Sequence, residues 1–158
     1  MARAPFQVLV MPFQVRAGGS VHVALFRRAD TGYWQGIAGG GQEGETPMEA
    51  AGREAFEEAG IDATARFFPL DARASIPVVD VCGFLWGPEV LVIPEYSFAA
   101  LVASGEFVLS SEHSECRWFK HEDAMTAVKW DSNRAAMWEL NHRAKHGRLL
   151  REEPCEGM

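Results

Sequence analysis

The sequence predicts an α/β fold, an α/β/α sandwich with a central mixed β-sheet. Strand-like segments stand on both sides of one well-defined helix at 46–60, and further helical segments close the chain. The length of 158 residues, 47% of them hydrophobic, suffices for one substantial core and not for two. We therefore predict a single domain over residues 1–150. A flexible tail is predicted at 151–158, where charged residues, a late proline and a glycine occur together.

The first part of the chain predicts three strands before the helix. Residues 6–15 alternate loosely and carry Val and Phe, and after a glycine turn residues 21–28 form a second, buried strand. Residues 34–37 form a short third strand. It leads into a glycine-rich loop at 39–41, which enters the helix and lets the backbone approach a ligand closely.

The helix itself has complete start and stop signals. Thr46 is a good N-cap, Pro47 occupies the first helical position, and Glu49 completes a capping box with Thr46. Gly60 follows as the glycine that ends the helix. The helix is therefore the most strongly predicted element of the chain.

The segments after the helix alternate less clearly. The predicted strands are 63–70, 75–86, 90–102 and 116–120. Pro94 marks an edge or a bulge in the third of them, where periodicity alone does not separate strand from helix.

Two helices are predicted at the end of the domain, 121–128 and 131–147. In the second, Asp131 is the predicted N-cap and Gly147 the stop. Ala135 and Trp138, three residues apart, are expected on its packed face.

Composition limits the classes of function. A formal net charge of −7 argues against binding a nucleic acid polymer over a broad basic surface. The apolar start is too short for a membrane span and lacks the layout of a signal peptide. Three widely spaced cysteines without a CxxC motif indicate reduced thiols in a cytoplasmic protein. The five histidines are scattered along the chain, so a metal site built from histidines is not expected.

Three carboxylates share one face of the central helix. Glu54, Glu57 and Glu58 lie at positions i, i+3 and i+4, so their charges repel unless they are solvated or bind a cation. A solvated acidic face is the simplest interpretation. The preceding glycines and the positive end of the helix dipole favour a second one, a Mg²⁺ site that also receives phosphate oxygens.

The stretch Gly39 to Ile61 resembles the Nudix box, in which Gly, Glu, Arg-Glu, Glu-Glu and Gly recur at fixed spacing. The matching residues are Gly39, Glu45, Arg53, Glu54, Glu57, Glu58, Gly60 and Ile61, with Ala55 at the inner apolar position. The resemblance implies the same sandwich architecture and the hydrolysis of a nucleoside diphosphate linked to another group.

The resemblance also implies roles for single residues. Glu54, Glu57 and Glu58 would be metal ligands or the base, with Glu57 on the open face of the helix. Arg53 and Glu45 would pair and hold the loop. The implied metal shell also includes the backbone carbonyl of Ala38. Of the glycines, Gly39 and Gly40 would contact the substrate, and Gly60 would be structural.

A further acidic residue is expected from the loop before the last strand. Many Nudix hydrolases carry one there, and Glu112 matches that place, with Glu115 as competitor. An ordinary surface glutamate is the alternative. His113 is interpreted as a capping or packing residue. Either Glu112 or Glu54 would act as general base, and the sequence leaves both open.

Four residues before the glycines are candidates for substrate binding. Arg27 and Arg28 are either solvated or hold a substrate phosphate. Trp34 is either core or a stacking surface for a heterocycle, and Gln35 follows it. The segments around Trp34-Gln35, Glu112-His113 and Trp130 to Arg134 resemble the dihydroneopterin triphosphate pyrophosphohydrolase branch. Diadenosine polyphosphate hydrolases also place Trp-Gln before the box.

We therefore expect a Mg²⁺-dependent pyrophosphohydrolase, with Mn²⁺ as substitute, that cleaves a nucleoside or pterin triphosphate to monophosphate and pyrophosphate. The alternatives are hydrolysis of dinucleoside polyphosphates or ADP-ribose, and a non-catalytic nucleotide-binding module. A dinucleotide would need a second stacking surface, for which Trp86, Tyr96 and Trp130 are candidates. The expected partner is a small molecule, and the expected state is a monomer or homodimer.

Overall fold

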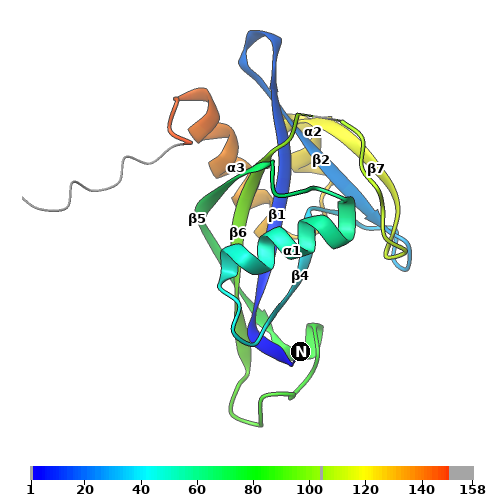
Figure 1. Ribbon diagram of the computed structural model, residues 1–158, viewed down its shortest axis with the longest axis vertical. Coiled ribbons are helices and arrows are strands. Elements are labelled where there is room, and N and C mark those ends of the chain that lie inside the picture. Colours follow the sequence, from blue (N-terminus) through cyan, green and yellow to red (C-terminus); the bar gives the residue numbers. More distant parts are fainter. Residues whose placement is uncertain (1, 104, 150–158) are drawn as a thin grey trace, which may run out of the picture.

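The computed structural model describes residues 2–103 and 105–149, so the predicted tail at 151–158 lies outside the described residues. Strands and helices follow one another in the order shown in Figure 1. The strands are β1 (Arg3–Arg16), β2 (Ser20–Arg28), β3 (Trp34–Gln35), β4 (Ile37–Gln42), β5 (Arg66–Pro77), β6 (Val92–Leu101) and β7 (His113–Lys120). The α-helices are α1 (Pro47–Ala59), α2 (His121–Ala127) and α3 (Asp131–Lys145), and short 3₁₀ turns occupy Ala17–Gly19 and Val78–Asp80.

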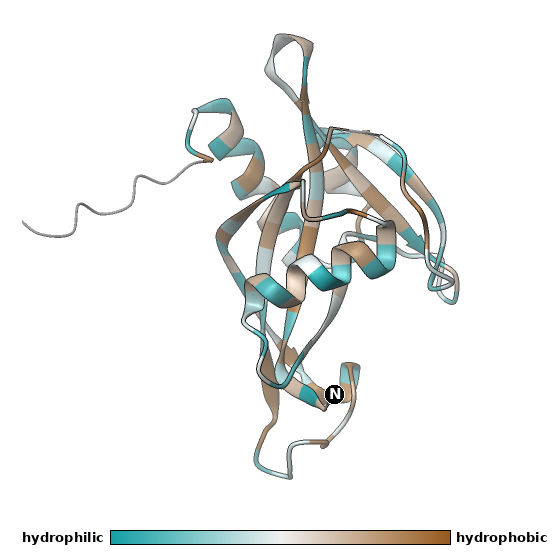
Figure 2. Ribbon diagram, viewed as in Figure 1, coloured by the Kyte–Doolittle hydropathy of each residue, from teal (hydrophilic) through white to brown (hydrophobic). Residues whose placement is uncertain are grey.

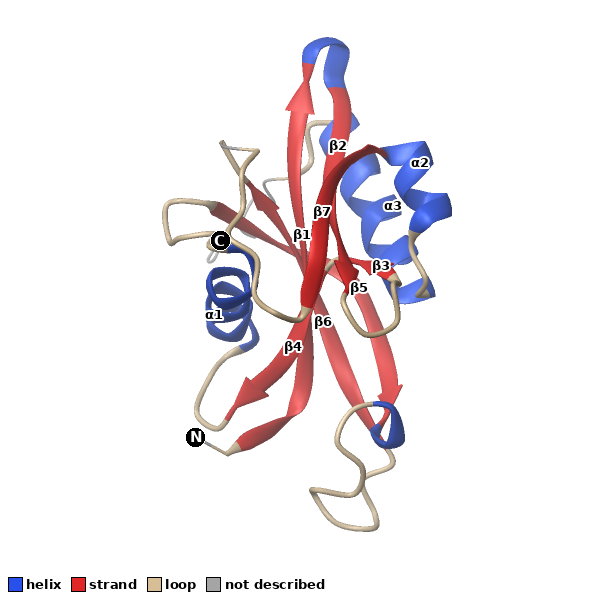
Figure 3. Ribbon diagram, turned by 90° about the vertical axis from the view of Figure 1, so that its right-hand side faces the viewer, coloured by secondary structure: helices blue, strands red, loops and turns tan. Residues whose placement is uncertain are grey.

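The strands of the described chain form one mixed sheet around the long strand β1. Strand β1 pairs in parallel with β6, and β6 pairs antiparallel with β5. On its other side β1 pairs antiparallel with β4 along its first half and with β2 along its last residues. Strands β2 and β4 therefore diverge from the same edge of β1, which Figure 3 shows from the side.

Helices cover both faces of this sheet. Successive side chains of a strand point to opposite faces, so Val8 and Val10 pack with the alanines of α1, whereas Leu9 and Met11 pack with α2 and α3. Figure 2 shows hydrophobic residues along the central strands and a banded pattern on α1, as expected for a helix with one buried stripe. The predicted sandwich with a central mixed sheet is confirmed.

The helix signals of the sequence operate as predicted. The Thr46 hydroxyl accepts from the Glu49 N–H at 3.2 Å and the Glu49 carboxylate accepts from the Thr46 N–H at 3.1 Å, which is a complete capping box. Pro47 is the first helical residue. Gly60 ends the helix with φ of 69°, a left-handed conformation that a side chain would disfavour.

The predicted glycine-rich loop is wrong, because residues 39–41 lie in strand β4. Gly39 and Gly40 pair with Val8 and Gln7 of β1. Each glycine of the run leaves room for a neighbouring side chain: a Cβ at Gly40 would lie 2.4 Å from Arg3 Nε, and one at Gly41 would lie 2.0 Å from Phe6 Cζ. The loop comes later, between Glu43 and Thr46.

The predicted strands after the helix also need correction. One strand, β5, runs without a break over Arg66–Pro77, and most of the predicted strand 75–86 is a 3₁₀ turn and loop. A register shift in the pairing with β6, between Pro69 and Arg73, accommodates the irregular middle of β5. Pro94 lies where β6 pairs with β5 and not yet with β1, so its missing N–H interrupts no bond to β1.

The orientation of α3 differs from the prediction in two ways. Trp130 is the N-cap and Asp131 is already the first helical residue, so the helix begins one position earlier than predicted. Ala135 is exposed and Trp138 is 60% exposed. The packed stripe is Asn133, Ala136, Met137, Leu140 and Arg143. Gly147, with φ of 64°, follows the helix as its predicted stop.

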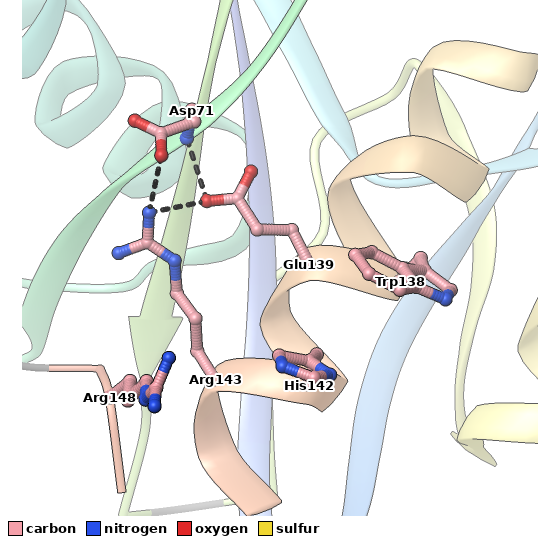
Figure 4. Close-up of a pocket in the computed structure, with 6 residues that line it drawn as sticks. All are labelled: Asp71, Trp138, Glu139, His142, Arg143 and Arg148. Atoms are coloured by element: carbon pink, nitrogen blue, oxygen red, sulfur yellow. Dashed lines mark hydrogen bonds and ion pairs between the residues drawn. The ribbon is translucent and has the colours of Figure 1, made fainter. Parts of the chain in front are cut away.

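Helix α3 is anchored to the irregular part of β5. The Glu139 carboxylate accepts hydrogen bonds from the backbone N–H groups of Asp71 and Ala72, both at 2.7 Å. Arg143 binds Glu139 at 2.7 Å and Asp71 at 3.0 Å. These groups line a small pocket of about 320 Å³ beside Trp138 and His142 (Figure 4).

Within the described residues no helix is long and apolar enough to cross a membrane.

Candidate active site

A cavity of about 1000 Å³ opens between helix α1, strand β4 and the start of α3. The cavity is lined by Glu54, Glu57 and Glu58 from α1, by Ala38, Gly39 and Gly40 from β4, and by Glu112 from the loop before β7. The structure thus brings together the carboxylates that the sequence singled out.

The three carboxylates of α1 differ in exposure. Glu54 and Glu58 are 8% and 7% exposed, whereas the Glu57 side chain is 53% exposed, as expected for the open face of the helix. Glu54 lies against the backbone of Gly39, where any Cβ would overlap its carboxylate. Burial raises the pKa of Glu54, although hydrogen bonds from Arg53 oppose this effect.

Arg53 holds the loop and the carboxylates together. Its Nε and Nη2 donate to Glu45 at 2.8 and 3.0 Å, so the expected pair is present in bidentate form. Its Nη1 donates to Glu54 at 3.0 Å and to Glu57 at 3.1 Å, and Nη2 also donates to the carbonyl of Gly40 at 2.8 Å. The guanidinium holds the pKa of Glu45 below its usual range.

Glu58 faces the loop that carries Glu112. Ser110 Oγ donates to Glu58 Oε2 at 2.9 Å, and His113 Nδ1 lies 3.1 Å from the same oxygen. Burial, together with the negative charge of Glu112, raises the pKa of Glu58 to about 7, against the bond from Ser110. Burial also lowers the pKa of His113, whose ring is almost fully enclosed.

Backbone bonds place Glu112 at the cavity. The Ser110 N–H donates to the Glu58 carbonyl at 3.2 Å, and the Ala29 N–H donates to the Glu112 carbonyl at 2.9 Å. The loop is therefore tied both to the end of α1 and to the end of β2. Glu115, the competing residue, pairs instead with Arg27 at 3.4 Å and does not line the cavity.

The donor set suits a hard divalent cation. The carboxylates of Glu54, Glu57, Glu58 and Glu112 are among those that line the cavity, and the repulsion of Glu57 and Glu112 contributes to the raised pKa of Glu54. Such oxygen ligands are those that Mg²⁺ prefers. Among the described residues no three acidic, histidine or cysteine side chains converge at metal-binding distance, and Arg53 binds both Glu54 and Glu57.

The predicted substrate-binding residues divide into two groups. Arg28 and Gln35 line the cavity, and Arg28 is held by a two-bond contact with Asp30 at 2.9 and 2.8 Å. Arg27 and Trp34 do not line it. The Trp34 ring packs edge-on against Phe119 at 5.3 Å, on the core beside α2, in agreement with the packing interpretation of this residue.

Several cavity residues have no counterpart in the predictions from sequence. Tyr33 is one of them; it lines the cavity beside Trp130, a stacking candidate from the sequence, with the two rings 6.2 Å apart and perpendicular. Gln7, Glu95 and Asn133 line it from β1, β6 and α3. Polar side chains inside otherwise apolar strands were the available signal for Gln7 and Glu95, because an inward polar residue needs a partner.

The fold and the clustered carboxylates define a hydrolase that acts on phosphoanhydrides. The chain belongs to the Nudix family: the model of the NUDIX domain matches residues 6–139, which include Glu54, Glu57, Glu58 and Glu112. The resemblance stated from the sequence is thereby confirmed. Members of this family generally use divalent metal ions.

Individual relatives agree with this assignment. The chain is 30% identical over 116 residues to the dihydroneopterin triphosphate diphosphatase of Escherichia coli, covering 72% of this chain and 77% of that protein. A crystal structure from Listeria monocytogenes, described as a NUDIX hydrolase, is 39% identical with a TM-score of 0.83 and covers 92% and 97% of the two chains. The structure of the E. coli dihydroneopterin triphosphate pyrophosphohydrolase has a TM-score of 0.73 at 24% identity, covering 89% and 99%.

Proposed function

We propose that this chain is a Mg²⁺-dependent pyrophosphohydrolase that cleaves a nucleoside or pterin triphosphate to monophosphate and pyrophosphate, with Mn²⁺ able to substitute. The observation that carries the proposal is the meeting of Glu54, Glu57, Glu58 and Glu112 in one cavity of about 1000 Å³. This volume is at the upper end of the range typical of small-molecule sites.

The proposed metal ligands are Glu54, Glu57, Glu58, Glu112 and the backbone carbonyl of Ala38. When bound, a divalent cation neutralises phosphoryl oxygens and lowers the pKa of a coordinated water. Arg53 has a different role, because it already bridges Glu45, Glu54 and Glu57 and so positions the carboxylates.

Proton transfer is assigned to a cavity carboxylate. Glu112 is more exposed than Glu54 and is not held by Arg53, which favours Glu112 as the group that accepts the proton of the attacking water. Glu54 is the second candidate. Arg28 lies at the same end of the cavity, where its guanidinium would bind a phosphate oxygen while Asp30 keeps it oriented.

The aromatic groups of the cavity favour a substrate with one heterocycle. Tyr33 and Trp130 are neighbours and together form one stacking location, whereas Trp86 and Tyr96 do not line the cavity. This favours a triphosphate over dinucleoside polyphosphates, which carry two bases. The relative that acts on dihydroneopterin triphosphate supports the same substrate class. A cytoplasmic location and a monomeric or dimeric state remain predictions from sequence.

The test is hydrolysis of a substrate panel with identified products. The panel contains dihydroneopterin triphosphate, the common NTPs and dNTPs, diadenosine tetraphosphate and ADP-ribose, ranked by kcat/KM with Mg²⁺, with Mn²⁺ and with EDTA. We expect a triphosphate to rank first and chelation to abolish turnover. A tenfold lead of ADP-ribose or the dinucleotide, about 1.4 kcal/mol, would refute the substrate assignment alone. Tight nucleotide binding without any product would support a binding module instead.

A further inference from the structure

Glu95 is a buried carboxylate that the proposed hydrolysis does not use. It lies on β6, is 3% exposed and lines the cavity. Gln7 Nε2 donates to its Oε2 at 2.6 Å. Its Oε1 is buried and has no hydrogen-bond partner of good geometry among the described residues, although Ser132 lies near the carboxylate.

A buried acceptor without a donor is unfavourable, and native structures contain few such groups. A carboxylate can accept about four hydrogen bonds; Gln7 supplies one, and the hydroxyl of Ser132 is the other nearby donor. Solvent supplies few donors here, because Glu95 is only 3% exposed. The missing donors are therefore expected from a molecule in the cavity.

The position of Glu95 is fixed by the sheet. Gln7 pairs with Glu95 on one side and with Gly40 on the other, and Ala74 of β5 pairs with Glu95. Cross-strand partners share a face, so these residues form one row across β4, β1, β6 and β5, and all four line the cavity. Gln7 is oriented in turn by Arg3, whose Nη2 lies 3.5 Å from Gln7 Oε1.

This row connects Glu95 to the metal-binding end. Gly40 follows Gly39, against which the Glu54 carboxylate packs, and Glu95 lies two strands away from Gly40. Adjacent strands are about 4.8 Å apart, so the separation is about 10 Å. Glu95 thus lies about two strand spacings from Gly40, and Ser132 at the start of α3 lies near its carboxylate.

We infer that Glu95, positioned by Gln7, is a specificity-determining residue that binds the hydrogen-bond-donating edge of a 2-amino-4-oxo heterocycle, as in guanine or a pterin. Such rings present a ring N–H beside an amino group, two parallel donors that match one carboxylate. Adenine and cytosine present a ring acceptor in the corresponding place and leave the carboxylate without this match. The inference rests on the proposed function and names the substrate class within it.

The test measures binding without turnover, so that it does not depend on hydrolysis. Calorimetry in metal-free buffer with EDTA compares GMP with IMP and pterin with lumazine, pairs that differ at the 2-position of the ring. We expect the wild-type protein to bind the 2-amino member of at least one pair about tenfold more tightly or better, the loss typical of one hydrogen bond to a charged group. Glu95→Gln should bring that ratio to about one.

Two further variants complete the experiment. Glu95→Asp keeps the charge but withdraws the oxygens, and should also lose the preference for the 2-amino ring. It replaces Glu95→Gln in the experiment if that variant does not fold. Glu122→Gln, an exposed glutamate on α2, should keep the wild-type ratio. Equal affinities within both pairs for the wild type, no measurable binding of the four probes, or a ratio unchanged in the Glu95 variants would overturn the inference. Failure of the proposed function appears separately, as absence of triphosphate hydrolysis by the wild type.

Discussion

The carboxylate of Glu54 packs directly on the backbone of Gly39. A Cβ at Gly39 would lie 2.1 Å from Glu54 Cδ and 2.4 Å from both carboxylate oxygens. Gly39 is an ordinary strand residue without positive φ, so the requirement for glycine here is space and not backbone conformation. The first glycine of the motif thus makes room for the first glutamate of the α1 triad.

Gly39→Ala is expected to displace Glu54 and to lower kcat/KM by at least about tenfold, 1.4 kcal/mol, with the fold retained. The matched control is Gly52→Ala on α1, where a Cβ meets nothing within 4 Å. That variant should keep activity and gain about 0.5–1 kcal/mol of stability, because alanine favours the helix. Steady-state kinetics and urea unfolding of both variants check the prediction; equal activity of the two would contradict it.

Glu57→Gln is expected to lower kcat by at least about 100-fold, 2.7 kcal/mol, because it removes a charge from the proposed metal site. Stability should change by no more than about 0.5 kcal/mol, since the side chain is 53% exposed. Glu122→Gln on α2 is the control for loss of an exposed carboxylate. The measurement is steady-state kinetics at several Mg²⁺ concentrations. Turnover equal to that of the wild type at all of them would show that Glu57 has no role in the mechanism.

The stability of the metal-free protein should depend on Glu58 between about pH 4.5 and 7. The folded-state pKa of Glu58 is raised from 4.5 to about 7, so the native state keeps a proton that the unfolded state has released. This contribution is complete below pH 4.5 and is lost as pH rises through 7, on the order of 2 kcal/mol. His113 acts in the opposite direction, because its lowered pKa costs stability as pH falls.

Comparison with Glu58→Gln separates the two effects. Thermal unfolding in EDTA should show that the wild-type protein is less stable at pH 8 than at pH 5. This decline in stability should be smaller or absent in the variant. Added Mg²⁺ should reduce the decline in the wild type, because a cation stabilises the ionised carboxylate. The same pH dependence in both proteins would show that Glu58 does not titrate in this window.

Glu139→Ala is expected to cost about 2–4 kcal/mol of folding free energy. It removes the acceptor of two backbone N–H groups of β5 and one partner of the buried Arg143 (Figure 4). The cavity lies elsewhere, so kcat of the folded protein should stay near the wild-type value. Urea unfolding and kinetics test both parts. Glu89→Ala in the exposed loop before β6 is the control, and a similarly small loss for both variants would mean that the anchor contributes little.

The strongest local signals predicted helix α1 correctly. Helix α1 forms between Thr46 and Gly60 because its capping interactions involve only residues close in the chain. The spacing of Glu54, Glu57 and Glu58 places them on one side of any helix. The strands at 6–15 and 21–28 were found for the same reason, since their apolar pattern is local.

Predictions that depended on distant partners failed. The glycines at 39–41 look like a loop until β1 is present to pair with them. The packed face of α3 was misassigned because two of its buried residues, Asn133 and Arg143, are polar. Asn133 accepts a hydrogen bond from the N–H of Gly36, just before β4, and Arg143 donates to Asp71 on β5. Periodicity assumes that buried residues are apolar, and here tertiary hydrogen bonds compensate polar ones.

The sequence by itself determined the family, the sandwich and the carboxylate cluster of α1, because each depends on residues close in the chain. Only the tertiary structure decided which side chains meet in the cavity. It placed Arg28 and Trp130 at the cavity, left Arg27 and Trp34 outside it, and brought Gln7 to Glu95 across 88 positions. The reason is physical: strand register and the twist of the sheet set these contacts, and both arise from pairings between segments far apart in the chain.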